Sequence, residues 1–251
     1  RLYRKNAASP LNIDGIIKRL TKKEKKEEKP FSLAISTVNI SNASATYDVL
    51  DAPRTPGRFN ARHIAIAGLG LTAYLPRLSN HDVRVDLQDF TCREESGLVV
   101  SGLEARVKYT PTSLSVDGLR VKTPGSELSF QPLDFTFEKI DQLKALGRTT
   151  PVTLVLKKGS HVTPADFTAF APVLRGFDTP VYIDFEIGGV LNNLAVSSLN
   201  VSTKRYASPF ELHVDGNVRG LGNVFEHRQQ GPLKDLNAEV LNVFAVCPAA
   251  A

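Results

Sequence analysis

Histidines and cysteines are the side chains of this 251-residue chain best suited to bind a metal ion or to act as a base or nucleophile. The five histidines lie apart, and none has metal-ligand spacing to a second His, Cys or Asp; they are His63, His81, His161, His213 and His227. We expect surface or strand-face positions for them. Cys92 and Cys247 form neither a disulfide framework nor a metal motif, and we expect small buried or half-buried thiols. A bridge between them in an oxidising compartment stays open.

Carboxylates and glycine-rich stretches suggest no catalytic site either. Glu94 and Glu95 are adjacent, so in a strand they point to opposite faces and do not form a catalytic carboxylate pair. The stretches IAGLGLTA and VRGLGN contain closely spaced glycines but show no signal of the following helix that a phosphate-binding loop needs. We therefore predict a protein that is not an enzyme and that has no metal and no cofactor.

The excess of positive charge is local. The chain carries a net charge of +5, and residues 18–29, KRLTKKEKKEEK, supply +4 of it through seven Lys or Arg against three Glu. A nucleic-acid-binding face needs a basic stripe interleaved with aromatic residues, and no such stripe is present. We expect no nucleic-acid partner, and we assign residues 1–30 to a helical, charged lead-in segment.

The elements that must position any site are strands with an unusual pattern. In LSVDGLRV, Leu114 and Val116 alternate with polar residues, Asp117-Gly118 interrupts, and the alternation resumes one residue out of phase. Because strand side chains have period two, a β-bulge at Asp117-Gly118 would keep both apolar pairs on one surface. The pattern returns in LAISTVNI from Leu33, IAIAGLGL from Ile64, VDLQDFTC from Val85, LVVSGLEA from Leu98, LAVSSLNV from Leu194 and LNAEVLNV from Leu236.

Plainer alternating strands lie between these stretches, and turn signals such as DAPRTPG and TPGS separate them. The sequence predicts a mainly antiparallel β fold with one apolar face along nearly every strand. A second sheet, a closed barrel, or a curved trough filled by something other than protein could each cover that face. Periodicity alone leaves these three open.

Helices are few. The apolar spacing from Asn12 predicts a helix over residues 12–28. A second is predicted near residues 163–175, with Thr163 as N-cap and Pro164 at the first helical position. The stretch FEKIDQLKALG predicts a third, short one that Gly147 closes. No apolar run approaches the roughly 20 residues that a membrane-spanning helix needs. Because the sequence begins at Arg1 and contains no Met, we expect a fragment or processed product.

Several motifs resemble those of one family. Residues 160–203 combine a TP-capped helix carrying D-F-x-x-F-x-P-x-L with an alternating strand, G-x-x-x-N-L and a further strand. The stretch E-E-S-G-L-x-V-x-G-L-x-A from Glu94 and the stretch T-P-G-S-E-L from Thr123 precede them. This progression resembles the AsmA-like envelope proteins, and among them the TamB-type translocation and assembly module proteins of the Bacteroidetes kind. The resemblance covers most of residues 30–245.

The resemblance implies a mainly β segment over residues 31–251, a long antiparallel sheet curved into a U-shaped groove (β-taco). It further implies a bacterial periplasmic protein that carries phospholipid acyl chains between the two membranes. A TamA-like outer-membrane barrel partner, and an inner-membrane anchor elsewhere in the parent chain, belong to the same expectation. The alternatives are a scaffold for barrel-protein assembly and a closed β-sandwich binding module. The residues expected to line the groove are Leu33, Ile35, Ile64, Ile66, Val83, Val85, Leu114, Val116, Val181, Ile183, Phe185, Leu194 and Val196.

Overall fold

A computed structural model gives the arrangement of the chain. It describes residues 1–15, 32–79, 81–138, 141–144, 146–190, 192–203, 210–219 and 237–246. Most of the helix predicted over residues 12–28, together with Cys247 and His227, lies outside these residues. In the described part of the chain, no helix is long and apolar enough to span a membrane.

Strands dominate the fold, as the alternating pattern predicts. The strands are β1 (Leu2–Arg4), β2 (Ser32–Val49), β3 (His63–Ser79), β4 (Val83–Glu94), β5 (Val99–Val100), β6 (Gly102–Thr110), β7 (Ser113–Lys122), β8 (Glu127–Ser129), β9 (Leu133–Thr136), β10 (Val152–Leu156), β11 (His161–Val162), β12 (Val181–Val190), β13 (Asn193–Ser202), β14 (Glu211–Arg219) and β15 (Asn237–Val246). The helical elements are α2 (Asp141–Lys144) and the 3-10 helices η1 (Pro164–Phe167) and η2 (Pro172–Leu174).

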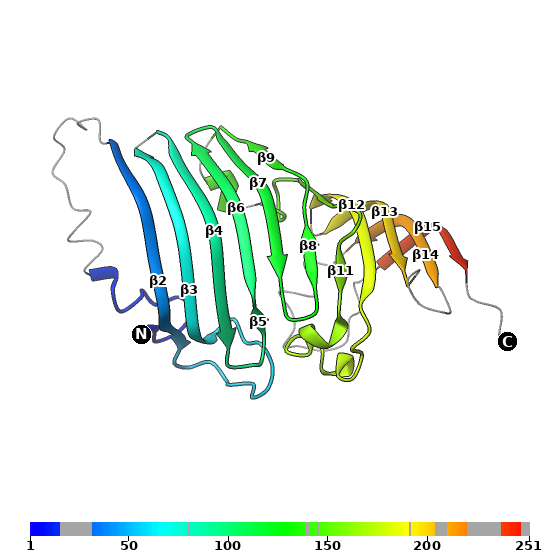
Figure 1. Cartoon of the computed structure of the whole chain (residues 1–251), viewed down its shortest axis with the longest axis horizontal. Helices are drawn as coiled ribbons and strands as arrows, with labels where there is room; N and C mark the ends of the chain where they lie inside the picture. Colours follow the sequence, from blue (N-terminus) through cyan, green and yellow to red (C-terminus); the bar gives the residue numbers. More distant parts are fainter. Residues whose placement is uncertain are drawn as a thin grey trace.

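All of these strands belong to one curved sheet (Figure 1). Its main path runs β1-β2-β3-β4-β6-β7-β8-β11-β12-β13-β14-β15, with β5, β9 and β10 paired beside it. Neighbouring strands are antiparallel, except for β1 beside β2. The sheet does not close on itself, and no second sheet faces it in the part of the chain that the structure describes. The mainly β, curved antiparallel sheet is therefore confirmed. The described strands form no two-sheet sandwich, because they all belong to one sheet, and no closed barrel, because β2 and β15 lie at opposite ends (Figure 1).

The bulge predicted in LSVDGLRV is present in β7. Val116 pairs with Val107 of β6, and Val121 pairs with Leu103, so β7 has one residue more than β6 between these pairs. Gly118 takes the left-handed backbone conformation, with φ of 63°, that such a bulge requires. Because Leu103 and Val107 share one face of β6, Val116 and Val121 share it too. The prediction is confirmed.

Four of the other out-of-phase stretches also coincide with shifts in strand pairing. They are those that begin at Leu33, Ile64, Val85 and Leu194, and the shifts lie in β2, β3, β4 and β13. Each extra residue is absorbed locally, so the apolar positions before and after it stay on the same side. Several strands of the curved sheet thus contain an extra residue relative to their partner and still keep one apolar side.

Of the two remaining stretches, one keeps its apolar side across a strand break and the other is wrong in detail. The stretch from Leu98 breaks into β5 and β6, where the amide of Ser101 bonds to the carbonyl of Lys122 at 2.9 Å, but Val100 still lies on the same side as Leu103 and Ala105. In the stretch from Leu236, the pairing with β14 shifts at Leu241 instead of directly after Ala238. Val240 is also apolar, so the sequence fits both placements and only the partner strand decides between them.

The helix predicted near residues 163–175 is wrong as one continuous element. The segment forms η1 and η2, two separate 3-10 turns with proline at their starts. Thr163 precedes η1 as predicted, but its hydroxyl donates to the carbonyl oxygen of Gly125 at 2.6 Å and does not cap the turn. The short helix before Gly147 is present as α2, and Gly147 has the expected positive φ of 74°.

Candidate functional site

One face of the sheet carries an unbroken apolar surface, which we call the apolar face. Directly opposed residues of neighbouring strands lie on the same side of a sheet, so the strand register identifies its members. One row crosses six strands through direct pairs, from Leu33 to Leu78, Val83, Tyr109, Leu114 and Phe135. A second row crosses four strands through Val85, Val107, Val116 and Leu133.

The apolar face continues past β7. Leu128 of β8 pairs with Val121 and so lies on the apolar face, which puts its neighbour Glu127 on the opposite side. Glu127 pairs with His161 of β11, and His161 pairs with Tyr182 of β12, so Tyr182 is on that opposite side too. Val181, next to Tyr182, therefore returns to the apolar face. The same argument places all thirteen predicted lining residues on it: Leu33, Ile35, Ile64, Ile66, Val83, Val85, Leu114, Val116, Val181, Ile183, Phe185, Leu194 and Val196.

This face is only partly covered. Among the described residues no large side chain is fully buried, and Leu33 and Ile40 of β2 are 42% and 38% exposed. The register puts four buried apolar residues on this face, Val49, Ala73, Ala105 and Leu156, and two of them are alanines. A closed hydrophobic core buries its large side chains completely. The apolar face is thus a half-buried surface, and its enclosure into a groove stays a prediction.

The opposite face is polar. Asp86, Arg106 and Asp117 follow one another across β4, β6 and β7, and Arg106 forms an ion pair with Asp117. The register puts two charged residues of the described chain, Arg4 and Glu94, on the apolar side. Both lie at the end of the sheet where β2 stops and β3 begins, so the charges mark a boundary of the apolar surface.

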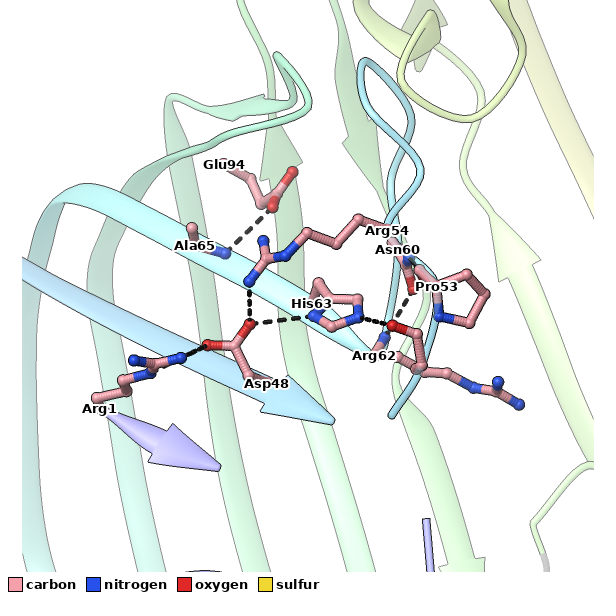
Figure 2. A network of polar contacts seen from close by, with 10 residues as sticks. Arg1, Asp48, Pro53, Arg54, Asn60, Arg62, His63, Ala65 and Glu94 are labelled. Carbon is pink, nitrogen blue, oxygen red and sulfur yellow. Dashed lines mark hydrogen bonds and ion pairs between the residues drawn. The ribbon is translucent and has the colours of Figure 1, made fainter. Parts of the chain in front are cut away.

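A second feature at this boundary is a cluster around the carboxylate of Asp48 (Figure 2). Asp48 accepts from Nε of Arg1 at 3.2 Å, from Nη2 of Arg54 at 2.7 Å and from Nδ1 of His63 at 3.0 Å. Nε2 of His63 lies 2.9 Å from the carbonyl oxygen of Ala52. The side chains of Asp48 and His63 are only 9% and 7% exposed, whereas both arginines are 60% exposed.

These donors shift the acidity of Asp48. The hydrogen bond from His63 is the largest cause that lowers the pKa of this carboxyl; burial opposes it, and the charges of Arg1 and Arg54 lower it further. Asp48 is therefore ionised at neutral pH. The sequence placed His63 on a strand face or surface; it is on the polar side of β3, but buried. No sequence signal marks its pairing with Asp48, because the two are joined only by strand register.

The loops at the same ends of later strands are fastened by a different carboxylate. Asp166 of η1 accepts from the hydroxyl of Thr123 at 2.5 Å, the amide of Gly125 at 2.9 Å and the hydroxyl of Ser126 at 2.6 Å. Thr163 returns two bonds to the same turn, from its amide to Ser126 and from its hydroxyl to Gly125. The T-P-G-S and T-P-A-D stretches of the sequence are thus two halves of one clamp.

None of these clusters is a metal centre. Within the described residues no group of three or more His, Cys, Asp or Glu is arranged to hold a metal ion. Cys92 lies half-buried in β4, and burial raises the pKa of its thiol. A bridge between Cys92 and Cys247 is not tested, since Cys247 lies outside the described residues. No protein-family profile, curated protein or solved structure matches this chain.

Proposed function

We propose that this chain is a segment of a TamB-type, AsmA-like bridge protein of the bacterial periplasm, whose apolar face shields phospholipid acyl chains on their way to the outer membrane. The inner-membrane anchor would belong to other parts of the parent chain. The observation that carries the proposal is the continuous apolar face, which spans β2 to β13 without closing into a core. Its role is collective and involves no catalytic residue.

Energetics favour an apolar occupant for this face. An exposed apolar patch beyond a few hundred Å² is uncommon on a soluble monomer and marks a binding surface. Each lipid methylene moved from water onto such a surface contributes about 0.8 kcal/mol, so one acyl chain is held by several kcal/mol. The half-exposed Leu33 and Ile40 are suited to this contact.

Photocrosslinking tests the proposal directly. A photoreactive amino acid replaces Val116, on the apolar face, and in a matched variant it replaces the neighbouring Ser115, which faces the polar side. Irradiation in cells followed by mass spectrometry is expected to yield lipid adducts at Val116 and none at Ser115. Equal labelling at the two positions, or no lipid at either, would contradict the proposal.

Charge substitutions supply a second test. Ile66→Asp or Val116→Asp puts an unpaired charge on the apolar face, which strongly disfavours contact with hydrocarbon. We expect the lipid extracted from the purified variants to fall well below the wild-type amount. Ser115→Asp is the control that adds the same charge to the opposite face and leaves the lipid content unchanged. Circular dichroism confirms that each variant keeps its strands.

The edge of β2 favours a second candidate function, the scaffold for barrel assembly. β1 pairs with β2 only at Tyr47–Val49, so residues 32–46 have no strand on their outer side in the described part of the chain. This stretch contains no charged residue and no proline. Natural proteins protect exposed edges with such residues, and an edge without them is suited to accept an added strand, here from a TamA-like barrel partner.

Lysines on that edge separate the two functions. Ala34→Lys and Asn39→Lys place charges on the polar side of β2, where they oppose edge pairing but leave the apolar face intact. The scaffold function predicts that the double variant loses binding to barrel proteins and keeps its lipid. The lipid function predicts that Val116→Asp lowers the amount of bound lipid, whereas the double lysine variant leaves the function intact.

A further inference from the structure

The imidazole of His63 lies between two hydrogen-bond acceptors. Nδ1 faces Oδ1 of Asp48 at 3.0 Å, and Nε2 faces the carbonyl oxygen of Ala52 at 2.9 Å. A carbonyl oxygen accepts only, and an ionised carboxylate accepts only. Both ring nitrogens must therefore carry a hydrogen for both contacts to be favourable, which is the imidazolium form.

The two acceptors belong to different parts of the fold. Asp48 is near the end of β2, whereas Ala52 belongs to the loop of residues 51–62, which we call the β2–β3 loop. This loop reaches the η1 region, where the amide of Phe59 donates to the carbonyl of Ala169 at 2.8 Å. The rings of Phe59 and Phe170 lie 5.1 Å apart. His63 thus bonds to the start of a loop whose later residues contact the segment between η1 and η2.

We propose that His63 is a pH-dependent latch that fixes the β2–β3 loop while its imidazole is protonated. Loss of the proton leaves one ring nitrogen as an acceptor facing another acceptor. The ring then keeps either the bond to Asp48 or the bond to Ala52, but not both. Histidine is the side chain that changes charge between about pH 5 and 8, so the latch would weaken as the pH rises through that range.

The surrounding charges come from four elements. The groups that face the His63 cluster are Asp48 of β2, Arg1 before β1, Arg54 and Arg58 of the loop, and Glu94 and Glu95 at the end of β4. Three carboxylates and three arginines thus surround the imidazole. Asp48 is the carboxylate in direct contact with the imidazole.

Nuclear magnetic resonance of the full 251-residue chain, labelled with ¹⁵N, tests the latch in the wild-type protein. At pH 5.5, both ring nitrogens of His63 are expected to show the chemical shifts of protonated nitrogen, and at pH 8.5 only one of them. The corrected hydrogen-exchange protection of the Phe59 amide should fall by about tenfold over the same interval, as one charged hydrogen bond is lost. An unprotonated ring nitrogen at pH 5.5, or protection that is the same at both pH values, would overturn the proposal.

Two variants isolate the effect. His63→Gln has a single donor nitrogen at every pH and cannot replace the two ring nitrogens, so the protection of Phe59 should be low and independent of pH. His81→Gln alters an exposed histidine in the turn between β3 and β4 and should keep the wild-type pH dependence. A His63→Gln protein that still changes with pH would refute the assignment, and the wild-type measurement decides the matter if that variant fails to fold.

Discussion

The middles of the strands and the loops at their ends are held in place by different chemistry. In the middles, the bulges tolerate an extra residue through the backbone, as the positive φ of 63° at Gly118 shows. At the ends, single carboxylates collect several donors: Asp166 from Thr123, Gly125 and Ser126, and Asp48 from charged groups. The bulges keep a surface continuous, and the carboxylates fix how the loops around it are attached.

Removal of the Asp166 carboxylate should have the largest effect of the changes considered. Asp166→Ala leaves two hydroxyls and one amide without their shared acceptor, and we expect a loss of about 3 kcal/mol in the free energy of unfolding. Urea denaturation followed by circular dichroism measures it. Asp178→Ala, which removes an exposed carboxylate just past η2, is the matched control and should change stability by less than about 0.5 kcal/mol. A similar small effect for both variants would show that the clamp does not hold the loop.

The clamp also depends on close approach of the backbone at Gly125. A Cβ atom there would lie 2.6 Å from Oγ1 and 2.8 Å from Cβ of Thr163, too close for any real contact. We expect Gly125→Ala to cost about 2 kcal/mol by overpacking, also measured by urea denaturation. Gly102→Ala is the control, because its nearest neighbour is a carbon of Lys122 at 3.5 Å. Equal effects at the two glycines would argue against a tight clamp.

Substitutions of Gly118 in the bulge should lower the stability of the fold through backbone conformation and not through steric contact. At Gly118 the nearest atom to an added Cβ is Nη2 of Arg106, at 3.9 Å, so the cost of a side chain there comes from the left-handed backbone. We expect Gly118→Val to cost about 1 to 2 kcal/mol, and Gly118→Asn distinctly less, since asparagine tolerates this conformation. The same denaturation experiment ranks the two. A larger cost for Asn than for Val would mean that the bulge is not the reason for glycine at this position.

The two regions also differ in how well the sequence predicts them. The bulges are local, so an alternation that slips by one residue, as in LSVDGLRV, identifies both the strand and its apolar face. The slip in β15 was misplaced because Leu241 and Val240 are both apolar, and the partner strand decides between them. All thirteen residues predicted to line the groove share one face for the same local reason.

The carboxylate clusters have no such local pattern in the sequence. Thr123 and Asp166 are 43 residues apart, and Asp48 and His63 meet through strand register alone. The residue types are visible in the sequence, but Ser, Thr and Asp are also what turns use, so their pairing has no local signature. Thr163 illustrates the difficulty, since the hydroxyl predicted to cap a helix donates instead to a distant turn.

The smallest expected effect is the response of the Asp48 cluster to acid. Because the hydrogen bond from His63, and then the two arginines, hold the pKa of Asp48 below its usual value of 3.8, the ionised carboxyl stabilises the folded state above that pH. This contribution is lost as the pH falls through the lowered pKa of the folded protein. The urea midpoint of the wild type should therefore drop more steeply between pH 5 and pH 3 than that of Asp48→Asn, which has no proton to gain there. Parallel curves for the two proteins would show that Asp48 contributes nothing to acid sensitivity.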